Sequence, residues 1–494
     1  MTDNYISDIP YPAVFHREMM PAWLDAVLRG LGQPTPDFAG RFRWCELGCG
    51  AGLNSLAVAA CHPAADVVAF DADPAQIQAA RSTAEAAGLR NIAFHQADFA
   101  EIAAAPAEQF GAFDVIVTHG VLSWISPAQR QAAFAFIGRA LRSNGLVYAH
   151  YMTHPGLSAA AAAQPLVRQY TMSLPGDSGQ KAEGALRFLS RFAAGGAGYF
   201  AAYPQESYRL QAALRQDRRA LAHELLPPYW QPFHVSEIMA EFAALGCRYL
   251  GSATPAENID AICLPSATQP LVAGITDLVL AETARDLARN QSLRRDLYMR
   301  GGQPLSPEPH RRALAALGLA ALPGAPRGGS LRFDTPIGPV QGEAALFGPL
   351  LTTLAQGPRS LEALSRLPGA PVHPALLNQA AQMLLWSGCA HPVARPLPDP
   401  APAWALNRQL VASGTAGWLV APALGTALPA SAEEMAAAAV VLSNPSISGA
   451  ALAAAIPALM RDKAIQWQRK TLPAWAALGV LPTESMEPLD GSSV

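Results

Sequence analysis

Five short apolar runs, separated by longer amphipathic segments, follow one another between residues 43 and 152. They read as strands at Arg43–Leu47, Asp66–Phe70, Ile92–Gln96, Asp114–Thr118 and Leu146–Met152. The segments between them, such as 74–87 and 127–141, place apolar residues at helical spacing. Because strands that alternate with helices build a parallel sheet covered on both faces, the sequence predicts a doubly wound α/β domain.

The length of 494 residues exceeds one ordinary core, so more than one domain is expected. After residue 152 the pattern breaks into helical pieces punctuated by Gly, Pro and Ser, which predicts an inserted helical cap at about 155–232. The α/β pattern then resumes with a helix at 235–245 and a strand at 247–251. Gly, Pro and Arg become dense from 301 to 329. We therefore predict one domain over 1–302 and a second over 303–494.

The second domain carries three short helical segments, Phe347–Gln356, Ser360–Arg366 and Ala375–Trp386, followed by Gly388 and an extended stretch at His391–Arg395. Three helices and an extended hairpin give a mainly helical, winged-helix-like outline. Such domains often bind DNA through the third helix, but this one contains no Lys or Arg that could reach a phosphate or a base. A protein-contact domain is the favoured interpretation, with DNA binding the alternative.

The composition limits the classes of binding partner expected for this protein. The 35 basic and 38 acidic residues give a net charge of −3, which provides no basic surface for nucleic acid. No stretch of roughly 18 apolar residues predicts a membrane span, and no basic run precedes an apolar one near the start, so we expect a cytoplasmic protein. The six cysteines form no CxxC pair and have no nearby His doublet, which predicts reduced thiols and no metal site.

A glycine-rich turn follows the first predicted strand, in the segment Glu46–Asn54. Glycines at 48, 50 and 52 let the backbone turn sharply and approach a ligand closely. Dinucleotide loops use G-x-G-x-x-G, whereas this loop reads G-x-G-x-G with an acid two residues earlier. That arrangement fits the aminoacyl end of S-adenosylmethionine (SAM), whose ammonium Glu46 can hold, better than it fits NAD. Cys49 suits the loop as a small residue, and we do not favour it as a nucleophile.

Two further acids stand where the same fold would use them. Asp71 ends the second predicted strand and can accept both ribose hydroxyls, while Asp98 and Phe99 after the third strand can meet adenine. Asp73 before Pro74 looks instead like a helix cap. The predicted cofactor contacts are Glu46, Gly48, Cys49, Gly50, Gly52, Asn54, Asp71, Ala72, Asp98, Phe99 and His119.

Several blocks beyond the glycine loop carry a family resemblance. They are Tyr11-Pro12, His119–Trp124, Leu221–Glu224, Tyr229–Pro232 and Leu293–Leu297. With them, the chain resembles class I SAM-dependent methyltransferases that carry a methyltransferase regulatory domain, a group that includes bacterial outer-membrane-protein lysine methyltransferases. The resemblance implies a Rossmann-like sheet, a regulatory region at about 220–300, and SAM as cofactor with S-adenosylhomocysteine as product.

Two departures from the family pattern lie where an acceptor would enter. The segment from His16 to Pro21 replaces a Thr-His-Pro element, and Leu122 stands where an aromatic residue is common. A methyl acceptor different from that of the family is therefore one hypothesis for this chain.

The reaction implied is methyl transfer to the side-chain nitrogen of a protein lysine. Groups that could orient or deprotonate the acceptor, or form an aromatic wall around it, are His119, His223, Glu224, Tyr11, Trp124, Tyr229 and Trp230. The Asn/Asp-Pro-Pro-Tyr/Phe segment that grips planar amino groups is absent after the fourth predicted strand. Methylation of a small molecule at nitrogen or oxygen, and a SAM-binding scaffold without catalysis, remain the alternatives. The sequence gives no signal for oligomeric state.

Overall fold

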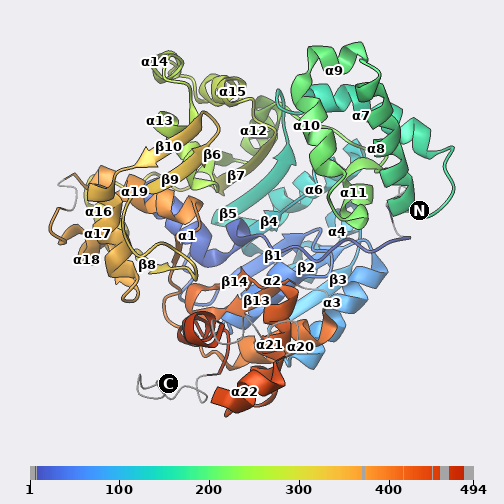
Figure 1. Cartoon of the computed structure of the whole chain (residues 1–494). Helices are drawn as coiled ribbons and strands as arrows, with labels where there is room; N and C mark the ends of the chain where they lie inside the picture. The colour runs from blue at the N-terminus through green and yellow to red at the C-terminus, as the bar shows by residue number, and fades with distance from the viewer. Residues whose placement is uncertain are drawn as a thin grey trace.

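The computed structural model describes residue 6 and residues 8–369, 373–414, 417–447, 449–456 and 467–482. Within these ranges, a seven-stranded mixed sheet occupies the centre of the molecule (Figure 1). Its strands are β1 (Arg43–Leu47), β2 (Asp66–Asp71), β3 (Ile92–Gln96), β4 (Phe113–Thr118), β5 (Leu141–Met152), β6 (Cys247–Ser252) and β7 (Leu293–Arg300). The predicted α/β sheet is confirmed, and β5 begins five residues earlier than the sequence suggested because α6 runs directly into it.

The strand order is β3-β2-β1-β4-β5-β7-β6. Strands β1 to β5 are parallel, and β7 is inserted antiparallel between β5 and β6. The order reverses direction between β1 and β4, and in open α/β sheets a ligand crevice forms at that point, outside the carboxyl ends of the strands.

Helices cover both faces of the sheet. On one face lie α1 (Pro21–Gly30), α2 (Leu53–Cys61) and α3 (Pro74–Ala86), and on the other α4 (Phe99–Ala104), α5 (Ala107–Phe110), α6 (Pro127–Ala140) and α12 (Val235–Ala244). Side chains alternate between the faces along each strand, so Trp44 packs toward α2 while Cys45 and Leu47 pack toward α6. Two separate hydrophobic clusters result.

Strand β7 is held by a buried ion network. Arg294, whose side chain is 2% exposed, pairs with Asp296 at 2.9 Å on its own strand. It also pairs with Asp286 at 2.5 Å and Glu282 at 2.7 Å, both on α15 (Leu278–Arg289). Breaking one partner of such a network leaves a buried charge uncompensated, so this helix and strand are expected to move as one unit.

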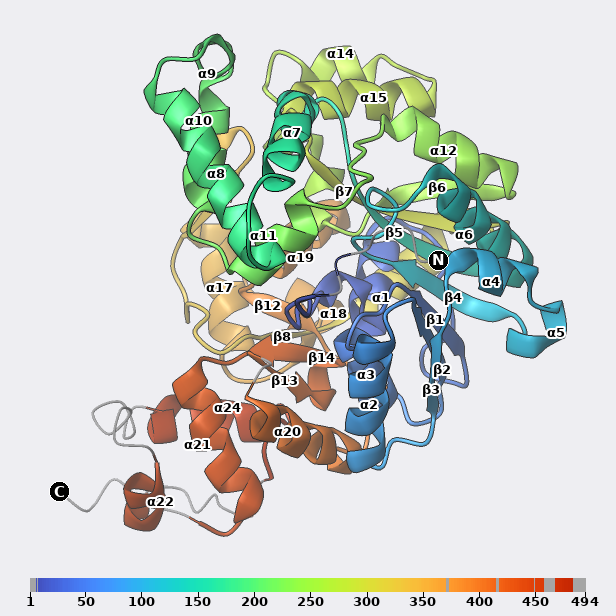
Figure 2. The ribbon, with the colours of Figure 1, turned by 90° about the vertical axis from the view of Figure 1, so that its right-hand side faces the viewer.

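Five helices form the segment predicted as a cap: α7 (Ser158–Thr171), α8 (Ser178–Ala194), α9 (Gly198–Ala202), α10 (Pro204–Ala213) and α11 (Arg218–Leu225). They share a small core that includes Leu186, Phe200 and Leu221, and Ile9 from the start of the chain packs against it. Figures 1 and 2 show them in green, gathered to one side of the sheet. We call this group the helical cap.

The C-terminal part contains the expected helices as α17 (Ala344–Leu354), α18 (Leu361–Ser365) and α19 (Pro374–Trp386). Its other elements are α16 (Pro307–Ala315), β8 (Gly318–Ala321), β9 (Leu331–Thr335), β10 (Gly338–Gly342), β11 (Arg359–Ser360), β12 (Ala390–Pro392), α20 (Ala401–Ser413), β13 (Trp418–Ala421), β14 (Thr426–Pro429), α21 (Ala432–Ser443), α22 (Gly449–Ala455) and α24 (Leu472–Ala477). Residues 391 and 392 of the expected extended segment pair with β8 in a small antiparallel sheet of order β11-β8-β12. The region is mainly helical.

One hydrophobic cluster continues from the central sheet into the C-terminal part. Trp23 of α1 and Leu56 of α2 belong to the same cluster as Leu385 of α19 and Leu419 of β13. No second, separate core divides the chain at residue 302 among the residues described here. The boundary between 302 and 303 stays a prediction from sequence.

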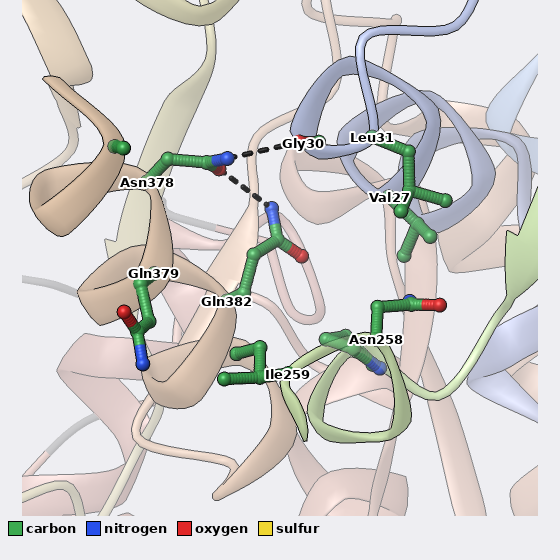
Figure 3. A pocket seen from close by; sticks show the side chains of 10 residues that line it. Val27, Gly30, Leu31, Asn258, Ile259, Asn378, Gln379 and Gln382 are labelled. Atoms are coloured by element: carbon green, nitrogen blue, oxygen red, sulfur yellow. Dashed lines mark hydrogen bonds between the residues drawn. The ribbon is translucent and has the colours of Figure 1, made fainter. Parts of the chain in front are cut away.

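Polar contacts also join α1 to α19. The Asn378 amide donates to the Gly30 carbonyl at 2.9 Å, and the Gln382 amide donates to the Ala26 carbonyl at 3.4 Å. The Gly30 carbonyl lies in the last turn of α1, where helical partners are missing, and the Ala26 carbonyl lies one turn earlier. These side chains line a cavity of about 210 Å³ together with Asn258 (Figure 3). The cavity lies at the junction of three chain regions, away from the carboxyl ends of β1 and β4.

The described ranges hold no helix long and apolar enough to cross a membrane. They also hold no group of three His, Cys, Asp or Glu side chains arranged to bind a metal ion. All six cysteines are free thiols, four of them buried.

Candidate active site

The glycine loop after β1 is fastened to β2 by its backbone. The amides of Gly48 and Cys49 both donate to the Phe70 carbonyl, at 2.8 and 2.9 Å. This bifurcated contact holds the turn at the carboxyl end of β1, directly in the crevice where the strand order reverses.

The three glycines of the loop have positive φ angles but different surroundings. A Cβ on Gly48 would lie 2.4 Å from the Val121 side chain, and one on Gly52 would lie 2.4 Å from the Phe94 ring. Gly50, with φ of 53°, has nothing within 4 Å of that position. Gly48 and Gly52 therefore allow close packing, whereas Gly50 borders open space that a ligand can enter.

Two acids stand beside this space, the buried Glu46 and the partly buried Asp71. Ser55 donates a hydrogen bond to the Glu46 carboxylate, and burial raises the pKa of Glu46 to about 7. Asp71 accepts from the Gly50 amide at 2.7 Å, and burial raises its pKa above the ordinary value. Neither acid forms an ion pair with any residue the structure describes. Buried carboxylates require a donor or cation, so this pair fits the ammonium and ribose hydroxyls of SAM.

The acid after β3 lies further out. Asp98 accepts from the Glu101 amide at 2.9 Å, the Glu101 carboxylate returns to the Asp98 amide, and together they form a capping box on α4. Phe99 is partly buried against the hydrophobic cluster between the sheet and helices α6 and α12. Asp73 caps α3 through the Ala75 amide at 2.8 Å, as the sequence indicated, and Ala72 lies in the turn before it.

Asn54 has a different set of partners from those expected. Its side-chain amide donates to the His16 carbonyl at 2.8 Å, and its side-chain oxygen accepts from the His16 amide at 3.1 Å. Both polar groups of Asn54 thus bind the backbone of residues that precede α1. We call residues 8–20 the N-terminal strap. Asn54 ties this strap to the first turn of α2, immediately after the glycine loop.

Three histidine rings are stacked where the strap meets the crevice. His16 and His119 have ring centroids 3.5 Å apart with 18° between planes, and His119 and His150 are 3.9 Å apart with 4° between planes. Burial lowers the pKa of His16 to about 4, and burial with neighbouring His150, His16 and Arg295 holds the pKa of His119 well below its usual value. The stack is therefore neutral at physiological pH.

The two inner rings are fixed by hydrogen bonds. His150 accepts from the Gly120 amide through Nδ1 at 3.1 Å, which fixes the turn after β4. His119 shares a 2.8 Å hydrogen bond between its Nδ1 and the Tyr148 hydroxyl. Arg295 lies beside this hydroxyl and counts among the charges that bear on the pKa values of both Tyr148 and His150. The register between β5 and β7 brings Arg295 beside Tyr148 and His150, because His150 on β5 pairs with Arg295 on β7.

The other predicted acceptor residues gather where the strap meets the helical cap. Tyr11 packs edge-on against His223, with centroids 5.2 Å apart, and His223 donates through Nε2 to the Ile9 carbonyl at 3.0 Å. Burial raises the pKa of Tyr11, with the Glu224 charge adding to the effect. Trp230 donates its indole N–H to the Glu224 carbonyl at 2.8 Å. Tyr11 and His223 therefore join the strap to the cap, and the Trp230–Glu224 hydrogen bond lies at the end of α11.

Two aromatic candidates have fewer contacts. Tyr229 is partly buried beside Trp230. Trp124 ends the turn after β4, and its buried indole N–H has no hydrogen-bond partner in the described part of the chain. A buried donor without a partner is costly, so this N–H is available to a bound ligand or water.

Sequence reasoning missed four residues of this site: His16 as a site residue, Tyr148, His150 and Arg295. Tyr148 and His150 alternate along β5 and so share a face, but nothing local shows which face that is. Arg295 reaches them only through the pairing of β5 with β7, 145 positions apart in register. The departure from the family pattern at His16 was the one available signal.

Comparisons with known proteins agree with this geometry. A family model described as a methyltransferase domain matches residues 45–145, and one described as a predicted methyltransferase regulatory domain matches residues 217–300. The Synechocystis protein sll1526 is 32% identical over 393 residues, which cover 79% of this chain and 76% of that protein. The Rickettsia prowazekii protein RP789 is 27% identical over 300 residues, 60% of this chain and 52% of that protein.

Solved structures show the same fold. The structure of PKMT2 from Rickettsia typhi in complex with AdoHcy superposes with a TM-score of 0.72 and 17% identity, covering 96% of this chain and 99% of that one. A second PKMT2 structure gives 0.69 at 16% identity, covering 96% and 100%. The shared architecture therefore includes the helical cap and the C-terminal part.

The Rossmann-like sheet, the glycine loop at its switch point and the two acids beside that loop define a class I SAM-dependent methyltransferase. The chain belongs to the methyltransferases that carry a methyltransferase regulatory domain.

Proposed function

We propose that this methyltransferase transfers the methyl group of SAM to the side-chain nitrogen of a lysine in a protein substrate. The observation that carries the proposal is the stack of neutral imidazoles beside the cofactor loop. An amine acceptor must be neutral to attack, and a neutral ring nitrogen can hold it without adding charge next to a sulfonium. The resemblance to outer-membrane-protein lysine methyltransferases supports the same acceptor.

In this proposal SAM supplies an activated methyl group, and the chain binds and orients the reactants. Glu46 faces the ammonium and Asp71 the ribose hydroxyls, with Gly50 leaving room for the cofactor. Asp98 and Phe99 are proposed to border the adenine. His119 is placed on the acceptor side, because it follows β4 and lies two residues from Val121, which touches the glycine loop.

The protein acceptor gives the remaining regions a role. We propose that His223 and Glu224 of the helical cap, with Tyr11 of the strap and Trp230 after α11, frame the entrance for a polypeptide, and that residues 303–494 contact the protein partner. Free thiols suit a reducing compartment, which favours reaction in the cytoplasm.

Transfer of labelled methyl from SAM tests the proposal. A whole-cell protein extract is incubated with the protein beside the same extract stripped of macromolecules. We expect label in protein bands that is recovered as methyl-lysine after hydrolysis. Label confined to the small-molecule fraction would replace the lysine proposal with a metabolite methyltransferase. SAM binding without label in either fraction would indicate a non-catalytic scaffold.

A further inference from the structure

The stack brings together rings from three distant parts of the chain. His16 comes from the strap before α1, His119 from the turn after β4, and His150 from β5. The two inner rings each have a nitrogen committed to the protein, His119 to Tyr148 and His150 to Gly120. Neither ring nitrogen of His16 has a hydrogen-bond partner among the residues that the structure describes. His16 is thus the outer member, half-buried and able to bind a ligand.

The position of His16 relative to the cofactor loop is set by its backbone. Asn54 binds both the amide and the carbonyl of residue 16, and Asn54 is the second residue of α2, whose N-cap is Gly52. The turn that carries His119 reaches the loop from the other side, through the contact between Val121 and Gly48. The strap and the turn therefore both meet the region of the glycine loop, and the His16 ring stacks on His119 there.

Charged groups around the stack are few. Glu18, on the strap, favours the protonated form of His16, and Arg295, on β7, disfavours it. Arg17 pairs with Glu18 at 3.6 Å. His119 and His150 face the ring from the turn after β4 and from β5. This setting keeps an imidazole nitrogen available as a hydrogen-bond acceptor.

We propose that His16 is the residue that contacts the methyl acceptor, with a ring nitrogen that accepts a hydrogen bond from the N–H of the incoming amine. The proposal rests on the methyl-transfer function above and names a contact of that same site. Stacking on His119 fixes the plane of the ring, so the hydrogen bond can orient the nitrogen lone pair toward the crevice.

The step balances without a further reactant. The amine first loses its extra proton to water. Its lone pair then forms the bond to the methyl carbon, while the carbon–sulfur bond breaks and its electron pair stays on sulfur. The positive charge of the sulfonium ends on the methylated nitrogen. His16 accepts a hydrogen bond throughout and neither gains nor loses a covalent partner.

Three substitutions separate hydrogen bonding from packing. His16→Phe keeps an aromatic ring to stack on His119 but has no nitrogen. His16→Gln restores a polar side chain that can accept a hydrogen bond. His16→Ala opens space that imidazole added to the buffer can fill. The exposed His373→Asn, in the C-terminal part, serves as the control, because Asn can still accept the hydrogen bond with which His373 caps α19. Each variant is measured for SAM affinity by calorimetry, for melting temperature, and for kcat and KM with the extract fraction that the parent protein labels.

For His16→Phe we expect SAM affinity within threefold of the parent, an unchanged melting temperature, and a fall in kcat of at least 30-fold. Part of that activity returns in His16→Gln, and added imidazole raises the turnover of His16→Ala at least fivefold. Full activity in His16→Phe would overturn the proposal and leave His16 a packing residue.

The experiments distinguish failure of the lysine proposal from failure of the His16 proposal. If the parent protein labels only small molecules, the acceptor proposal falls, and the same variants still test His16 with that fraction. If the parent binds SAM and labels nothing, both proposals are overturned.

Discussion

The Asp71 carboxylate accepts a hydrogen bond from the Gly50 amide, with 2.7 Å between Oδ2 and N, and so ties the end of β2 to the glycine loop. Asp71→Ala removes this bond and the proposed ribose contact together. We expect SAM affinity to fall at least 100-fold, measured by calorimetry. Asp73→Asn is the matched control, because Asn also caps helices and keeps the backbone amide that donates to Asp71, and the Asp73 side chain binds the start of α3. Parent-like SAM binding by Asp71→Ala would mean that the ribose lies elsewhere.

Gly50 and Gly88 form a second matched pair. Both have positive φ, 53° and 67°, and neither has an atom within 4 Å of an added Cβ. Substitution by Arg therefore strains both backbones alike, by about 1 kcal/mol. We expect Gly50→Arg to abolish SAM binding, because its side chain enters the cofactor space, and Gly88→Arg to bind SAM normally. Equal loss of binding in the two variants would point to unfolding, which circular dichroism would reveal.

His119→Ala tests the inner part of the histidine stack. The ring shares a hydrogen bond with Tyr148 and stacks on His16 and His150. We expect SAM affinity to change less than fivefold while kcat falls at least tenfold. Rapid-quench and equilibrium binding measurements separate the two effects. Loss of SAM binding with normal folding would assign His119 to the cofactor instead.

His391 predicts a pH dependence of stability. The ring is 1% exposed and near Trp23, and burial lowers its pKa to about 3. The unfolded chain therefore binds a proton at His391 below about pH 6.5 while the folded chain does not. The contribution of His391 to the free energy of unfolding is complete above pH 6.5. It falls as the pH drops toward 3, by up to about 1.4 kcal/mol for each pH unit.

The matched variant for this effect is His391→Phe. Between pH 7.5 and pH 5, the parent should lose about 2 kcal/mol more unfolding free energy than the variant, as measured in urea. His373→Asn, at an exposed position and with the cap of α19 kept, should behave like the parent. Identical pH slopes for the parent and His391→Phe would show that another group controls acid unfolding.

A fragment of residues 1–302 tests the domain boundary. In the full chain α1 and α2 pack against α19, α20 and β13 within one hydrophobic cluster. Without those elements, apolar side chains such as Trp23 and Leu56 become exposed, so we expect the fragment to aggregate or to melt at least 10 °C below the full chain. Gel filtration and calorimetry report the outcome. Cooperative unfolding at the temperature of the full chain would establish 1–302 as an independent domain.

Local pattern predicted the sheet well. Strands β1 to β4 lie within a residue or so of their predicted ranges, because each is a short apolar run bounded by turn or capping residues such as Asp73. The glycine loop and its acid were identifiable for the same reason, since spacing within nine residues determines how that turn can form. Features encoded in one contiguous segment are visible in a single sequence.

Contacts between distant segments were not visible. Asn54 stays a predicted cofactor contact, but its local sequence gave no sign that its side chain binds both backbone groups of His16, 38 residues away. The histidine stack needs three segments and the register of β5 on β7. The continuous core across residue 302 likewise depends on which faces of α1 and α19 meet. These contacts depend on how distant segments pack in the folded chain, and the local sequence of each segment does not determine that packing.

The regulatory region is not an appendage that could be removed while leaving a catalytic unit intact. Its strand β7 lies hydrogen-bonded beside β5, so Arg295 sits opposite His150, and the Arg294 network anchors that strand to α15. A mutation that shifts α15 would therefore also shift β7, and with it Arg295 beside the histidine stack. Control elements attached to α15 would reach the proposed acceptor side of this protein through β7.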